Sequence, residues 1–120
     1  AAPSLAPLEE AFYERALRIQ HGPALEAWLG RWAALVRADG QEPAARRAQM
    51  KRVNPRFVLR NYMAQEAIDM AEQGDLSRVH ELLDLLRRPY DEQPERARFA
   101  QRRPDWARQR AGCSQLSCSS

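Results

Sequence analysis

Proline and glycine divide this chain into stretches in which apolar residues recur every three or four positions. That spacing is typical of helices with one buried face. No stretch alternates apolar and polar residues, as a half-buried strand does. The sequence therefore predicts an all-α fold, a small bundle of about five helices.

The first three helices are bounded by residues that favour helix ends. We expect the first to run from a cap at Ser4 to Gly22. The second should open at Pro23, because proline is favoured in the first turn of a helix, and end near Asp39. A short, weakly amphipathic helix is expected over residues 42–53.

Clearer signals mark the next two helices. Asn54 is a favourable N-cap and Pro55 suits the first helical position, so a fourth helix is expected from there to Gly74. A fifth should start at Asp75 or Ser77 and continue to the next proline. Its expected buried face consists of Leu76, Val79, Leu82, Leu83 and Leu86.

The sequence from Pro89 to Arg110, PYDEQPERARFAQRRPDWARQR, contains three prolines. It is expected to be irregular, with a short turn at residues 104–108. We therefore divide the chain into a helical region, residues 1–89, and an irregular C-terminal extension, residues 90–120.

Some aromatic residues are large for a bundle of this size. They are Trp28, Trp32, Phe57 and Tyr62. We expect some of them, or the segment from Tyr90 to Trp106, to face a neighbour.

Composition limits the classes of protein to which the chain can belong. Its 120 residues suffice for one modest core, and 44% are hydrophobic, near the globular norm. The net charge of +3 is too small to indicate a nucleic-acid-binding protein, and Lys51 is the only lysine, as expected from a GC-rich genome. No apolar run reaches the length of a membrane span, and no leader resembles a signal peptide. Two cysteines are too few for a secreted disulfide scaffold, so we expect a cytoplasmic bacterial protein. We expect no membrane partner. Because Ala1 is not methionine, we expect the chain to be a piece of a longer polypeptide.

Few residues in the sequence have the pattern of an active site. His21 and His80 lie far apart, and with Cys113 and Cys118 they match no recognised zinc spacing. The acidic clusters are expected to pair with arginines on the surface. We therefore expect no catalytic, metal-binding or cofactor-binding residue in this segment.

One segment resembles a nucleic-acid-binding surface. Arginines interleaved with Phe99 and Trp106 can neutralise phosphates and stack on bases. The arginines are Arg96, Arg98, Arg102, Arg103, Arg108 and Arg110. The acidic residues Asp91, Glu92, Glu95 and Asp105 dilute the charge, so we favour arginines that pair within the protein and expect no nucleic-acid partner. The alternative function is a free-standing helical module that binds nucleic acid or an acidic protein through residues 96–110.

Four ordered blocks resemble the C-terminal end of the selenoprotein O family, the YdiU-type proteins of bacteria. They are NPRFVLRN at residues 54–61, RPYDEQP at 88–94, PDW at 104–106 and SCSS at 117–120. The resemblance covers residues 50–120 and is looser before them.

The resemblance implies that the chain is the C-terminal part of a larger kinase-like protein. Members of this family transfer AMP from ATP to hydroxyl side chains of proteins, with Mg²⁺ or Mn²⁺. Their nucleotide-binding, metal-binding and catalytic residues precede the matched segment, so none is assigned here. The implied partners are the missing N-terminal kinase-like core of the same polypeptide and the protein substrates of the parent.

The resemblance assigns a function to Cys118. Members that contain selenocysteine carry it third from the end, where Cys118 stands in SCSS. Bacterial members with cysteine at this place can form a regulatory disulfide with the core, so Cys118 is the implied redox residue. Cys113 lies outside the motif, and either forms a local disulfide with Cys118 or has no redox role.

The other motif residues are expected to be structural. Arg60 should bridge helix termini or acidic side chains, and Asn61 should satisfy loop backbone groups, both one turn inside the fourth helix. Direct binding of nucleotide or substrate by these two residues is the alternative. The same structural expectation covers Asn54, Pro55, Pro89, Tyr90 and Trp106. The predicted function is thus a non-catalytic helical region that supports the core and carries a redox-sensitive cysteine.

Overall fold

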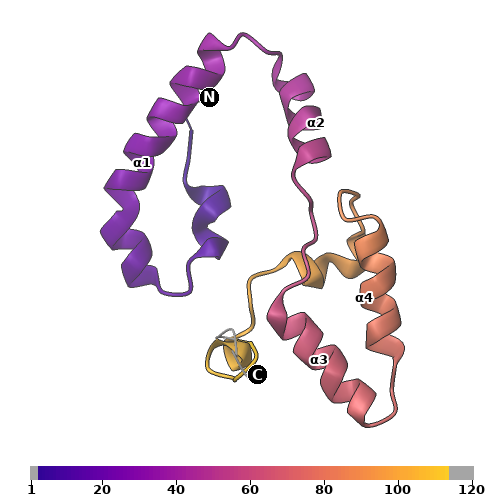
Figure 1. Cartoon of the computed structure of the whole chain (residues 1–120). Helices are drawn as coiled ribbons and strands as arrows, with labels where there is room; N and C mark the ends of the chain where they lie inside the picture. Colours follow the sequence, from indigo (N-terminus) through magenta and orange to yellow (C-terminus); the bar gives the residue numbers. More distant parts are fainter. Residues whose placement is uncertain (1–2, 114–120) are drawn as a thin grey trace. The chain divides into compact units, whose positions relative to one another are not determined.

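A computed structural model describes residues 3–113 and consists of helices joined by loops (Figure 1). The order is η1 (Ala6–Ala11), α1 (Arg15–Ala38), α2 (Pro43–Val53), α3 (Asn61–Glu72), α4 (Ser77–Arg87), η2 (Pro94–Ala100) and η3 (Asp105–Arg108), where η denotes a 3-10 helix. The residues described contain no strand, so the predicted all-α class is confirmed. The chain divides into two compact units, the N-terminal unit Ala1–Ala48 and the C-terminal unit Gln49–Ser120.

Helix α1 is continuous where the sequence predicted a break. Gly22 and Pro23 both lie inside it, so the expected helix end and helix start at these residues are wrong. An interior proline removes one backbone hydrogen bond, and its ring crowds the residue before it. Gly22 has no Cβ to be crowded, and the nearest atom to a Cβ added there is the flexible end of Arg18, 3.0 Å away. A glycine directly before the proline therefore allows the helix to continue.

The residues before α1 form the short η1 instead of a long first helix. Ser4 lies at its start, and its Oγ accepts a hydrogen bond from the Ala6 amide at 3.2 Å. Leu5 is buried, as are Leu29 and Ala33 of α1. These three are the buried hydrophobic residues described in the N-terminal unit, so its core is small.

Helix α2 begins within one residue of the predicted start. The Glu42 carboxylate accepts a hydrogen bond from the Ala45 amide at 3.0 Å, and such bonds from Ala44 and Ala45 hold the pKa of Glu42 below its ordinary value. At the other end, Asn54 Nδ2 donates to the Met50 carbonyl at 2.9 Å. Asn54 therefore closes α2, whereas the sequence predicted that it would cap the next helix.

Helix α3 begins at Asn61 with Arg60 at its N-cap, so the predicted start at Asn54 and Pro55 is wrong. The segment before it is held by the end of the next helix, because the amides of Arg56 and Phe57 both donate to the Pro89 carbonyl, at 2.7 and 3.0 Å. These tertiary hydrogen bonds override the local Asn-Pro signal. The predicted end is close to the observed one: α3 ends at Glu72, and Gly74 follows in a left-handed turn with φ 86°.

Helix α4 begins at Ser77, as one of the two predicted starts requires, and its Ser77 amide donates to Asp75 Oδ1 at 2.9 Å. It pairs with α3 to form a helical hairpin (Figure 1). The predicted buried face is only partly right. Leu82 is buried, but the most buried residue is Leu85, which was not predicted. The apolar residues that are exposed instead are Leu76, Val79 and Leu83.

The core of the C-terminal unit joins the hairpin to the segment that follows it. Its buried residues are Phe57, Tyr62, Met63, Ala67, Leu82, Leu85, Phe99, Ala107 and Cys113. Phe99 comes from η2, which the sequence did not predict, and Ala107 comes from η3, which matches the predicted turn. The Pro- and Arg-rich segment is therefore part of the packed structure.

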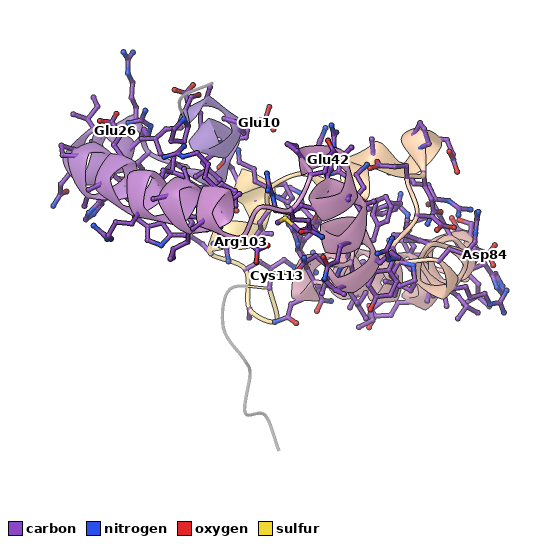
Figure 2. The ribbon with its side chains drawn as sticks, turned by 90° about the horizontal axis from the view of Figure 1, so that it is seen from above. Glu10, Glu26, Glu42, Asp84, Arg103 and Cys113 are labelled. Carbon is purple, nitrogen blue, oxygen red and sulfur yellow. The ribbon has the colours of Figure 1, made fainter. Side chains whose placement is uncertain are left out.

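Charged side chains such as Glu26 of α1 and Asp84 of α4 lie on the outer surfaces of their helices (Figure 2). Of the four large aromatics expected to seek a neighbour, Phe57 and Tyr62 are buried within the C-terminal unit, whereas Trp28 and Trp32 are exposed. Within the described part of the chain, no helix combines the length and hydropathy needed to cross a membrane.

Candidate functional site

The motif blocks of the C-terminal unit meet in space. The carbonyl that accepts the Arg56 and Phe57 amides of NPRFVLRN belongs to Pro89 of RPYDEQP. In the same block, Glu92 lies 2.9 Å from Lys51 Nζ and 3.8 Å from the Arg56 guanidinium. These ion pairs are exposed and therefore contribute little by themselves. The two backbone hydrogen bonds are the stronger tie between the blocks.

Gln93 is the buried polar side chain of this region, with 3% of its surface exposed. Its Nε2 donates to the carbonyls of Leu85 and Arg88 at 3.1 and 3.0 Å, and its Oε1 accepts from Arg96 at 2.8 Å. The last carbonyls of a helix lack the usual partners inside the helix, so Gln93 supplies donors at the end of α4 in addition to the Arg88 and Asp91 amides. Sequence reasoning missed this residue, although the RPYDEQP block contains it.

Arg60 and Asn61 lie at the start of α3, not one turn inside a helix as expected. The Arg60 guanidinium donates to the Gln101 carbonyl at 2.6 Å. This bond joins NPRFVLRN to the loop after η2. Among the other motif residues, Tyr90 has an exposed side chain, and so has Pro55.

Three contacts between distant segments follow one order along the chain. Lys51 contacts Glu92, Arg60 contacts Gln101, and Asp69 contacts Arg110. Residues 92–110 thus follow residues 51–69 in the same direction along the unit.

Trp106 of the PDW block packs against Tyr62 of α3. The ring centroids lie 6.3 Å apart with an angle of 86° between the planes, an edge-to-face geometry that aromatic pairs favour. The Arg110 guanidinium lies 5.8 Å from the centroid of the Trp106 ring and makes two hydrogen bonds to Asp69, at 2.6 and 2.8 Å. The bonds from Arg110 and then from Gln65 hold the pKa of Asp69 below its ordinary value. The contacts of Trp106 with Tyr62 and of Arg110 with Asp69 together hold the PDW block against α3.

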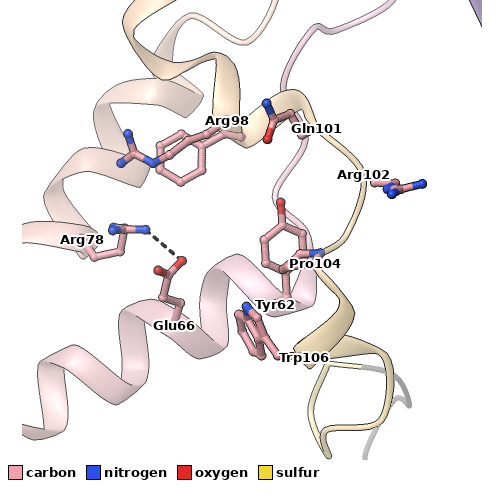
Figure 3. Close-up of a pocket in the computed structure, with 9 residues that line it drawn as sticks. Tyr62, Glu66, Arg78, Arg98, Gln101, Arg102, Pro104 and Trp106 are labelled. Atoms are coloured by element: carbon pink, nitrogen blue, oxygen red, sulfur yellow. Dashed lines mark ion pairs between the residues drawn. The ribbon is translucent and has the colours of Figure 1, made fainter. Parts of the chain in front are cut away.

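An open pocket of about 340 Å³ is lined by α3, α4 and the segment around η2 and η3 (Figure 3). Arg98 and Arg78 lie over the Phe99 ring, 4.3 and 5.6 Å from its centroid. Arg78 pairs with Glu66 at 2.8 Å, and both arginines pair with Glu81. Two glutamates thus balance the charge of two of the arginines in the pocket wall. The remaining lining residues are Tyr62, Gln101, Arg102, Pro104 and Trp106.

Several arginines of the arginine-rich segment contact their own unit. They are Arg96, Arg98, Arg108 and Arg110. Arg98 and Arg110, for example, are bound to Glu81 and Asp69. These internal contacts favour the predicted pairing within the protein over binding of phosphates.

Cys113 is buried in the core, with 6% of its surface exposed, and its thiol is free. Gly112 before it has φ 81°, and a Cβ there would lie 2.8 Å from Gln65 Oε1, so this turn requires glycine. Cys118, the implied redox residue, lies outside the described residues.

Metal-binding side chains do not cluster in the part of the chain that the structure describes. There, no three His, Cys, Asp or Glu residues lie close enough together to hold an ion. His21 and His80 are exposed on different helices. Carboxylates such as Glu66 and Asp69 are engaged by arginines instead. The histidines and carboxylates described here therefore do not form a binding site for the metal and nucleotide that the resemblance implies for the parent, and we assign none of them a part in the reaction.

Comparison with known proteins gives a clear family assignment. No family model matches the chain. It is 59% identical over 118 residues to a protein nucleotidyltransferase YdiU of Xanthomonas campestris pv. campestris, a match that covers 98% of this chain and 23% of the relative. It is 57% identical over 120 residues to the protein of the same name from Methylobacillus flagellatus, covering 100% of this chain and 23% of that one. For the Azoarcus relative the identity is 59% over 111 residues, covering 92% of this chain and 21% of the relative.

The chain spans less than a quarter of the length of the curated relatives it matches. The match extends through both compact units and includes the motif blocks described above. It is consistent with a C-terminal segment of these proteins. The chain therefore belongs, as one segment, to the YdiU-type (selenoprotein O) family of protein nucleotidyltransferases.

Proposed function

We propose that this chain is the non-catalytic C-terminal helical region of a protein adenylyltransferase, which supports the kinase-like core and carries a redox-sensitive cysteine. The observation that carries the proposal is the use of the motif residues inside the C-terminal unit. The Pro89 carbonyl, Arg60 and Trp106 each hold one motif block against another element. Residues used in this way support a structural role for the segment.

In this proposal the parent transfers AMP from ATP to Ser, Thr or Tyr hydroxyls, and ATP and Mg²⁺ or Mn²⁺ bind outside this chain. The printed name of the relatives, protein nucleotidyltransferase, supports transfer of a nucleotide to proteins. The choice of AMP rests on the family resemblance. The proposed partners are the kinase-like core of the same polypeptide and the protein substrates of the parent, in the bacterial cytoplasm.

A transfer assay tests the non-catalytic role. The 120-residue polypeptide, incubated with labelled ATP, Mg²⁺ or Mn²⁺ and a protein acceptor, is expected to leave the acceptor unlabelled. The full-length parent should label it. Robust labelling by the short polypeptide contradicts the non-catalytic role, and no labelling by the parent contradicts the proposed reaction.

The redox role of Cys118 is tested in the full-length parent with oxidised glutathione as the oxidant. Formation of a protein disulfide takes two electrons and two protons from two thiols, which the added disulfide accepts. Cys118→Ser should remove the response of AMP transfer to oxidation and leave the rate under reducing conditions unchanged. Cys113→Ala is the matched control and should keep the response, because the Cys113 thiol is buried. A response that survives Cys118→Ser rules out this residue as the switch.

A further inference from the structure

Helix α1 carries an apolar face that its own unit covers only in part. One side of the helix packs in the small N-terminal core through Leu29 and Ala33. The exposed residues beside this buried side are Leu17, Trp28, Trp32 and Leu35, which we call the α1 face. With 3.6 residues per turn, they project within about 60° of one another. Trp28 and Leu35 are 49% and 72% exposed.

A helix with this composition depends on packing against other elements. Pro23 removes a hydrogen bond from its interior, and helices gain most of their stability in proteins from the burial of an apolar face. On the buried side of α1, only Leu29 and Ala33 among the described hydrophobic residues are packed in the core. Exposed apolar residues that include two tryptophans one turn apart are typical of an interaction site.

The family match indicates what covers this face. More than three quarters of each matched relative lies outside the matched segment. A helix that needs packing to persist requires a partner that is always present, and a surface on the same polypeptide meets that need. We infer that the α1 face docks on an apolar surface of the parent N-terminal to the matched segment. The inference rests on the proposed function and names the place where this region attaches to the core.

Site-specific photo-crosslinking in the full-length parent tests the inference. Trp32 is replaced by benzoylphenylalanine, which keeps an aromatic side chain on the α1 face. Irradiation and peptide mass spectrometry should identify a crosslink to residues that precede Ala1 in the same polypeptide. Ala34 is the matched control, because it is exposed and lies two positions further along the helix, on nearly the opposite side.

The other possible occupants give different crosslinks. A crosslink to residues 49–120 means that the C-terminal unit covers the face, and a crosslink between two polypeptides means that a second copy does. Either result overturns the inference. So does a yield at position 32 no higher than at position 34.

A thermal unfolding experiment on the same parent gives an independent readout. Trp28→Glu places a charge in the docked face and should lower the Tm by several degrees, whereas Ala34→Glu should change it little. Equal shifts for the two variants overturn the inference. Neither experiment measures AMP transfer, so a parent with normal transfer but no such crosslink disproves the docking alone. A parent that crosslinks as expected but transfers no AMP disproves the proposed reaction alone.

Discussion

Gln93 holds the end of α4, the RPYDEQP block and the start of η2 with one side chain. Its amide nitrogen donates to the Leu85 and Arg88 carbonyls at the end of α4, and its oxygen accepts from Arg96. These hydrogen bonds replace hydration that the polar groups lose on burial. The stability of the hairpin therefore depends on the amide group and not only on the size of this side chain.

Gln93→Leu should lower the free energy of unfolding of the α4 region by about 1–3 kcal/mol, because the hydrogen bonds to the Leu85 and Arg88 carbonyls and the one from Arg96 are all lost. Gln93→Glu should cost at least as much, since a carboxylate cannot donate to these carbonyls. Hydrogen exchange of α4 peptides in the full-length parent measures the change. Gln109→Leu, at an exposed position of the same unit, is the control and should leave α4 protection nearly unchanged. Equal loss of protection in the Gln93 and Gln109 variants contradicts this role.

Asp69 makes the C-terminal unit sensitive to acid. Arg110 and Gln65 hold its pKa in the folded state below the ordinary value of about 3.9. The charged form therefore adds stability above about pH 4, and this stability is lost as the pH falls through the lowered pKa. Asp69→Asn should flatten the decline of Tm in acid, measured on the parent from about pH 7 to 3. Asp105→Asn, whose side chain is 85% exposed, should keep the decline, and an unaltered decline in Asp69→Asn contradicts the prediction.

The sequence marks important residues here but not their partners. Arg60 was expected to be structural, and it does join two segments, yet its partner is a loop carbonyl 41 positions away. No local pattern specifies such a pair. Gln93 was missed for the same reason, because a glutamine after a helix is recognisable as a cap only once the helix end folds back onto it.

At the level of elements, side-chain capping of helix starts could be predicted from the sequence. Competition between a local helix signal and hydrogen bonds from distant residues could not. The starts of α2 and α4 depend on Glu42 and Asp75, which bond to amides two or three residues ahead. The start of α3 depends on the Pro89 carbonyl, which draws residues 56 and 57 out of any helix. The exposed stripe on α4 has the same spacing as a buried one, so periodicity alone could not separate them.

The Gly22-Pro23 pair in α1 leads to a prediction about helix continuity. Gly22→Val should destabilise α1, because its Cβ branch meets the proline ring of the next residue. In a Pro23→Ala background the same substitution should cost much less, and Pro23→Ala alone should stabilise the helix by up to about 3 kcal/mol by restoring a backbone hydrogen bond. Hydrogen exchange of α1 in the parent, analysed as a double-mutant cycle, measures the coupling. Additive effects of the two substitutions contradict the explanation.

At the scale of the whole molecule, buried apolar residues are unevenly divided. Among the residues that the structure describes, the C-terminal unit buries nine in one cluster, whereas the hydrophobic residues buried in the N-terminal unit are Leu5, Leu29 and Ala33. The sequence predicted apolar stripes in both halves, and an apolar stripe looks the same whether or not a partner covers it. Periodicity could not identify the residues that cover each stripe, which in the C-terminal unit lie far along the chain, as Trp106 does from Tyr62.

The order in which the core of the C-terminal unit is filled has a consequence during protein synthesis. Of the described residues in this core, Phe57 is the first in the chain and Cys113 the last. At 5–20 residues per second, a ribosome needs about 3–11 seconds to translate the stretch between them. Until Phe99, Ala107 and Cys113 have been made, the apolar sides of α3 and α4 remain exposed, so we expect chaperones that recognise exposed hydrophobic segments to bind the nascent chain.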